Sequence, residues 1–135
     1  MHKVLVVEDS ASTRALVRGI LEDPSFSQKT GAVEVTLAKN GVEALQLLSR
    51  ESFDLCVTDI NMPGIHGLEL IKFIRSSATL AQLPVVIIST QTTQRDIERG
   101  LSLGANAFVK KPLDLAELQK TCSDLLSQFG ARGAS

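Results

Sequence analysis

Five polar side chains come at the ends of short apolar runs of the sequence. They are Glu8, Asp9, Asp59, Ser89 and Lys111. If those runs are parallel strands of one sheet, their carboxyl ends meet at one edge, which is where open α/β sheets bind ligands. The order of the chain therefore predicts a compact polar site built from separate strands.

Such a cluster would have a specific chemical capacity. Three carboxylates held together repel one another and persist only where positive charge neutralises them. Oxygen ligands alone select a hard cation, and Mg²⁺ typically takes one or two carboxylates while leaving room for water and phosphate oxygens. A carboxylate beside Mg²⁺, the Lys111 ammonium and the Ser89 hydroxyl is suited to attack phosphorus and to form an acyl phosphate.

Each of these residues also has an ordinary role when it is considered alone. Carboxylates in loops are usually solvated, and aspartate and serine commonly cap helices or stabilise turns. For Asp59 taken singly, a turn or a cap explains the residue as well as catalysis does. The functional interpretation therefore depends on the five residues being brought together.

The elements that must position these residues are visible in the hydrophobic pattern. Apolar runs alternate with amphipathic stretches, and the runs are 4–7, 33–38, 55–57, 85–88 and 107–109. The first and fourth are continuously apolar, as in parallel strands covered on both faces, whereas the second alternates like an edge strand. This pattern predicts an α/β fold: a doubly wound five-stranded parallel sheet flanked by five helices.

The ends of the helices are also readable. Asn40 opens a capping-box pattern, and a weaker version with Thr93 opens the helix expected at about 93–103. Either Ser10 or Ser12 begins the first helix. Segment 24–32 is polar and is predicted to be a surface loop. We expect one domain over residues 1–129, followed by a flexible tail or truncated linker at 130–135.

The composition argues against several classes of protein. The 135 residues include 14 basic and 15 acidic side chains, so no basic excess indicates nucleic-acid binding. No apolar run approaches the roughly 18 residues of a membrane span, and the N-terminus does not resemble a secretory signal, so we expect a cytoplasmic protein. Cys56 and Cys122 lack metal-site spacing and are interpreted as buried thiols of a reducing compartment, not as disulfide partners or metal ligands.

Several segments together resemble the signature of the bacterial two-component response-regulator receiver domain, and in particular single-domain regulators of the chemotaxis type. The segments are 4–9 (VLVVED), 59–64 (DINMPG) with Gly67, 84–89 (PVVIIS) and Lys111-Pro112. They occur in the family's order, and the resemblance extends from about Lys3 to Phe129. A single piece such as Lys-Pro would be weak evidence, but the combination is specific.

The resemblance implies a flavodoxin-like sheet with strand order 2-1-3-4-5 and a phosphorylation switch. Asp59 would accept a phosphoryl group from a histidine kinase or phosphotransfer protein, and the protein would catalyse its own phosphorylation and dephosphorylation without being a turnover enzyme. The ligands of Mg²⁺ would be Glu8, Asp9, Asp59 and the backbone carbonyl of Asn61.

Further roles follow from the same resemblance. Lys111, which adjoins the proline and is favoured over Lys110, would contact the phosphoryl group and precede a cis peptide bond to Pro112. Ser89 would take the switch position. Phe108 would move inward on activation, although a static core aromatic is the alternative.

The resemblance also implies an output surface for a downstream protein. That surface would consist of the fourth helix (about 93–103), the fifth strand (107–109) and the fifth helix (114–129). A phosphorylation-dependent homodimer is compatible with the family, whereas direct nucleic-acid binding and membrane insertion are not indicated.

Two residues depart from the common pattern. Glu8 is longer than the aspartate more often found there, which affects the position of the metal. Thr90 follows Ser89 where a smaller residue is common, so its branched side chain could crowd the phosphoryl pocket and alter the rates.

Three other interpretations remain open. A phosphohydrolase of the dehalogenase type would need an acid where Asn61 stands. A pseudo-receiver would keep the fold without phosphorylation, although such proteins usually lack the aspartate or the acidic pair. The chain could also be the receiver part of a larger regulator.

Overall fold

The computed structural model describes residues 1–60, 62, 64–90 and 93–133. Strands and helices alternate along most of the chain. In order they are β1 (His2–Val7), α1 (Ala11–Glu22), α2 (Pro24–Thr30), β2 (Val33–Ala38), α3 (Gly41–Arg50), β3 (Leu55–Asp59), α4 (Gly67–Ser76), β4 (Val85–Ser89), α5 (Gln94–Ser102), β5 (Ala107–Lys110) and α6 (Leu115–Gly133).

The strands form one parallel sheet in the order β2-β1-β3-β4-β5, which confirms the predicted topology. The apolar runs 4–7 of β1 and 85–88 of β4 are buried throughout, because both strands lie inside the sheet and are covered on both faces, and this explains their continuously apolar sequences. β2 lies at an edge of the sheet, as the alternating pattern indicated, and four of its six residues are partly or fully exposed, whereas Val35 and Ala38 are buried.

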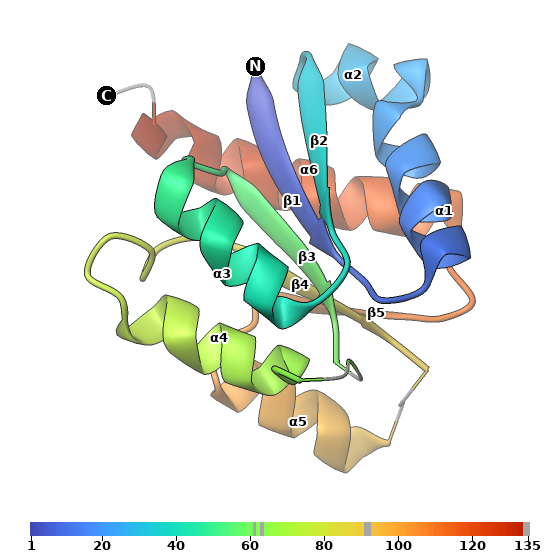
Figure 1. The fold of residues 1–135 in the computed structure, drawn as a ribbon. Coiled ribbons are helices and arrows are strands. Elements are labelled where there is room, and N and C mark those ends of the chain that lie inside the picture. Colours follow the sequence, from blue (N-terminus) through green and yellow to red (C-terminus); the bar gives the residue numbers. More distant parts are fainter. Residues whose placement is uncertain (61, 63, 91–92, 134–135) are drawn as a thin grey trace.

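Helices cover both faces of the sheet, so there are two hydrophobic cores (Figure 1). Successive residues of β1 point to opposite faces, as the pleat of a strand requires. Val4 and Val6 join a core with α1, α2 and α6, whereas Leu5 and Val7 join a core with α3 and α4. The strands are therefore held from both sides, and their carboxyl ends are fixed relative to one another.

The structure corrects one prediction. Segment 24–32 was expected to be a polar surface loop, but Pro24–Thr30 forms the short helix α2, so the described chain has six helices and not five. Asp23 caps this helix by accepting a hydrogen bond from the backbone N–H of Ser25 at 2.9 Å. Phe26 is fully buried in the core beside α1 and α6, and this single aromatic side chain anchors an otherwise polar segment.

The predicted helix starts are confirmed. The Asn40 side chain accepts a hydrogen bond from the Glu43 N–H at 2.8 Å, and the Thr93 hydroxyl accepts one from the Asp96 N–H at 3.2 Å. Ser10, not Ser12, caps α1. At the other end of the chain, α6 runs past Phe129 to Gly133, so the backbone at 130–133 is helical. The domain boundary at 129 stays a prediction.

Both cysteines are free thiols buried in the protein, and they lie in different cores. Cys56 belongs to the core with α3 and α4, and Cys122 belongs to the core with α1 and α6. Burial raises the pKa of each thiol to about 12. In the described part of the chain, no helix combines the length and the apolar character that crossing a bilayer requires.

Candidate functional site

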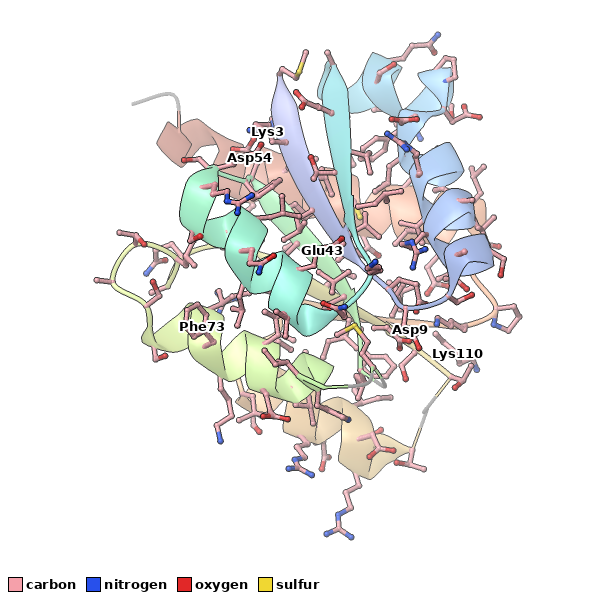
Figure 2. All side chains as sticks on the ribbon, in the orientation of Figure 1. Lys3, Asp9, Glu43, Asp54, Phe73 and Lys110 are labelled. Atoms are coloured by element: carbon pink, nitrogen blue, oxygen red, sulfur yellow. The ribbon has the colours of Figure 1, made fainter. Side chains whose placement is uncertain are left out.

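The sheet brings the predicted polar residues to one edge. Glu8 and Asp9 follow β1, and the Glu8 N–H extends the ladder by donating to the carbonyl of Ala38 at 3.0 Å. The backbone N–H of Lys111 donates to the Ser89 carbonyl at 2.9 Å, which holds the residue after β5 beside the end of β4. Asp9 and Lys110, both labelled in Figure 2, mark the carboxyl ends of β1 and β5.

Three carboxylates converge at this edge. Glu8, Asp9 and Asp59 each offer an oxygen atom, and these atoms lie within 4.8 Å of one another. Glu8 is fully buried and Asp59 is 7% exposed, whereas Asp9 faces solvent. The group is therefore a half-enclosed set of hard oxygen donors, open on the side of Asp9, and its chemistry suits a small divalent cation.

Lys111 supplies the positive charge within this cluster. Its Nζ lies 2.6 Å from Glu8 Oε1 and 3.4 Å from Asp59 Oδ2. Burial lowers the pKa of the Lys111 ammonium, but the hydrogen bond to Glu8 and the charges of Asp59 and Glu8 outweigh this effect, so the pKa is raised overall. Lys110 is exposed, which supports Lys111 over Lys110 as the lysine of the site. The Lys111-Pro112 peptide bond is cis, as the resemblance implied.

One ammonium does not neutralise three carboxylates. The pKa of the Asp9 carboxyl is raised, chiefly by hydrogen bonding to Glu8 and further by partial burial and the negative charge of Glu8. A raised pKa means that ionised Asp9 is disfavoured by its surroundings. The cluster therefore retains excess negative charge, which a bound cation would offset.

The backbone around Asp59 is closely held. The Ile60 N–H donates to Asp59 Oδ1 at 2.8 Å, and the Thr58 hydroxyl donates to the Asp59 carbonyl at 2.9 Å. The chain then returns so that the Gly67 N–H donates to the Ile60 carbonyl at 2.9 Å. Asn61, whose carbonyl the resemblance assigns to the metal, lies outside the described residues.

Arg14 is a residue of the site that the sequence analysis did not identify. Its Nη1 donates to the carbonyl of Glu8 at 2.8 Å and to that of Asp9 at 3.0 Å, so it fixes the backbone of the acidic pair. A cation in the first turn of a helix is unfavourable next to the positive end of the helix dipole. An arginine at this unfavourable position of α1 was the feature of the sequence that could have indicated its role in the site.

Ser89 and Phe108 lie on the neighbouring strands β4 and β5. Ser89 is fully buried at the end of β4, next to Lys110 of β5 in the sheet register. Phe108 is half-buried and packs against the core that contains α3 and α4. Thr90 is exposed, directly after Ser89.

Comparison with known proteins places these features in context. The model of the response regulator receiver domain family matches residues 4–123 of the chain. The chemotaxis protein CheY-3 of Vibrio cholerae serotype O1 is 34% identical over 127 residues, which cover 94% of this chain and 93% of that protein.

Solved structures show the same fold. The chemotaxis response regulator CheY4 of Vibrio cholerae is similar with a TM-score of 0.82 and 32% identity, covering 93% of this chain and 99% of the other. The receiver domain of a sensor histidine kinase from Pseudomonas aeruginosa PAO1, described with a magnesium ion in its active site cleft, is similar with a TM-score of 0.79 and 26% identity, covering 96% and 98%.

Replacing Gly67 with alanine should distort this site without removing any polar group. A Cβ at Gly67 would overlap the Asp59 carbonyl oxygen and would lie 2.8 Å from the Ile60 Cα, and neither backbone atom can turn aside. We expect the free energy of unfolding, measured with urea, to fall by about 1–3 kcal/mol.

Gly19→Ala is the matched control for Gly67→Ala. No atom lies within 4 Å of a Cβ added at Gly19 in α1, so alanine should raise the free energy of unfolding by up to about 1 kcal/mol. Equal stability of the two variants would contradict the close approach of α4 to Asp59.

Proposed function

Since this chain belongs to the response regulator receiver family and acts in two-component signalling, we propose that Asp59 is its phosphoacceptor. The observation that carries this proposal is the position of the Lys111 ammonium against Glu8 and Asp59, inside a group of three carboxylates. Among the three, Asp59 alone comes from the central strand β3 and lies next to β4, which carries Ser89. This makes Asp59 the carboxylate best placed to meet a phosphoryl group.

The reaction is a transfer between two nucleophiles. A carboxylate oxygen of Asp59 attacks the phosphorus of a phosphohistidine, the new O–P bond forms as the N–P bond breaks, and the released imidazole takes up a proton from water. The Ile60 N–H holds Asp59 Oδ1 at 2.8 Å, which leaves Oδ2, on the side of Lys111, as the attacking oxygen. Phosphoryl transfer requires this kind of positioning and charge neutralisation more than covalent help from the protein.

Lys111 would change partners during the reaction. The ammonium now lies closer to Glu8 than to Asp59. When a phosphoryl group is attached to Asp59, its oxygens carry more negative charge than the carboxylate they replace, so Lys111 moves toward them. Binding of a cation by Glu8 before the transfer would help to release Lys111 for this move.

Glu8, Asp9 and Asp59 would hold Mg²⁺, with the backbone carbonyl of Asn61 as a further ligand. The oxygen-only donor set fits this ion, and a related receiver domain is described with magnesium in its cleft. Bound Mg²⁺ would neutralise charge on the phosphoryl oxygens. Arg14 keeps the two consecutive carboxylates in place by holding their backbone.

Phosphorylation would be read out through Ser89, Phe108 and the surface of α5, β5 and α6. The Ser89 hydroxyl can turn toward a phosphoryl oxygen, which would displace α5 and make room for Phe108 to move inward. α5 contains Gly100 in its interior, and Ile97 is only half-buried, so the helix is lightly held. We propose this surface for the downstream protein and a histidine kinase or phosphotransfer protein as the phosphoryl donor.

The assignment of Asp59 can be tested directly. Acetyl phosphate with Mg²⁺ should phosphorylate Asp59, and Asp59→Asn should abolish the modification because the amide is a poor nucleophile. Borohydride trapping followed by mass spectrometry locates the acyl phosphate. Reproducible modification of Glu8 or Asp9 in the intact protein would refute the assignment, and sustained phosphate release from p-nitrophenyl phosphate would indicate a hydrolase instead.

Phosphorylation should depend strictly on the divalent cation. Without it, the carboxylates and the anionic donor repel each other in a partly enclosed site of low dielectric constant. Glu8→Gln combined with Asp9→Asn should therefore weaken Mg²⁺ binding, measured by calorimetry, and suppress phosphorylation at Asp59. Equal phosphorylation in the presence of EDTA would show that the metal is not required.

The route from Ser89 to α5 gives a separate expectation. Beryllofluoride, which mimics the phosphoryl group, should shift the amide NMR signals of residues 93–103 and of Phe108. Ser89→Ala should reduce these shifts, since it removes the hydroxyl that contacts the phosphoryl oxygen. Identical responses in the two proteins would exclude this route while leaving phosphorylation of Asp59 intact.

A further inference from the structure

A groove between α4 and α5 takes no part in the phosphoryl transfer proposed above, although α5 itself also belongs to the proposed output surface. Its volume is about 270 Å³, and both helices and their ends contribute to its lining: His66, Leu68, Glu69, Lys72, Arg99 and Leu103. Figure 1 shows the two helices next to each other on one face of the sheet. None of these residues belongs to the carboxylate site, so the groove is a separate feature of the surface.

Two cationic side chains reach this groove without a partner of their own. Lys72 of α4 and Arg99 of α5 are exposed, and neither side chain makes an ion pair or hydrogen bond with another residue of the described chain. Lys3, Lys111 and Lys120, in contrast, each pair with a carboxylate. Positive charge from two different elements is therefore available at one place.

The acidic residue in the groove is already engaged. Glu69 Oε1 accepts a hydrogen bond from the His66 N–H at 3.3 Å, and His66 Nδ1 accepts one from the Leu68 N–H at 3.2 Å. This reciprocal cap directs the Glu69 carboxylate to the N-terminus of α4, where the helix dipole favours it. His66 must be neutral at Nδ1 to accept that bond, so two cations and one anion leave a formal charge of +1.

The size and the apolar part of the groove limit what it can hold. Leu68 and Leu103 are half-buried and form its apolar part. A volume of about 270 Å³ is below the usual range of pockets for nucleotides and other small-molecule ligands. It is sufficient for one or two side chains that enter from a neighbouring surface.

We infer that this groove binds an acidic segment of a protein partner. A glutamate of the segment would place its carboxylate between Lys72 and Arg99 and its methylene groups against Leu68 and Leu103. A glutamate side chain combines the charge and the short apolar stem that the groove accommodates. The inference does not require Asp59 to be phosphorylated, so it can be tested on the protein alone.

The test is a titration of the isotopically labelled chain, followed by NMR, with a blocked hexapeptide of sequence ALEELA. Its uncharged analogue ALQQLA and inorganic phosphate are titrated in parallel. ALEELA should shift the signals of Leu68, Lys72, Arg99 and Leu103 and should bind weakly. The combined variant Lys72→Gln with Arg99→Gln should weaken this binding by about fivefold or more, as expected for two exposed charge pairs.

Two further variants act as controls of opposite kind. Lys29→Gln with Arg50→Gln removes one lysine and one arginine from the exposed surface of α2 and α3, and the affinity should stay within about twofold. Glu69→Gln keeps the capping box, because glutamine also serves at that position. It removes the negative charge that would repel the glutamates of the peptide. It should therefore strengthen binding of ALEELA.

Each alternative outcome would overturn the inference. Equal loss of affinity in the two double variants would show that only the net charge of the protein matters. Binding of ALQQLA as tight as that of ALEELA would remove the role of the carboxylates. Inorganic phosphate that shifts the same signals with equal or higher affinity would assign the groove to small anions and not to a protein segment.

Discussion

Charge neutralisation at the carboxyl edge of the sheet is the constraint on which the rest of this structure depends. Glu8 is fully buried, and a buried carboxylate without a counter-ion costs several kcal/mol. Its counter-ion, Lys111, lies more than a hundred residues away in the sequence and reaches Glu8 only when β5 pairs with β4 in the observed register. The pairing of β5 with β4 therefore completes the sheet and at the same time neutralises the buried Glu8. The reactive site forms only when the chain folds.

Much of this arrangement could be predicted because the strands are buried on both faces. Interior parallel strands must be apolar along their length, so polar residues such as Asp59 stand out at their ends. α2 could not be predicted in this way. Its sequence is polar, it is stabilised by the single buried side chain of Phe26, and one aromatic residue produces no helical periodicity.

The sequence predicts where a polar side chain lies in the fold better than it predicts which group that side chain contacts. The sequence places Lys111 at the site, but the preference of its ammonium for Glu8 over Asp59 depends on reach. Glutamate extends one methylene further than aspartate, and this difference brings its carboxylate to Lys111. The cap of α4 was hidden for a related reason, since histidine is not among the usual capping residues and His66 acts as one only through a neutral ring nitrogen.

The two buried thiols have a practical consequence for observing the protein in motion. Because burial raises the pKa of both thiols to about 12, very little thiolate is present at pH 8, and neither Cys56 nor Cys122 is accessible to reagents. A cysteine introduced on the surface of α5 would then react alone with a fluorescent or spin label. Displacement of that helix could be followed in the otherwise unaltered chain, without first replacing the native cysteines and disturbing the two cores they help to fill.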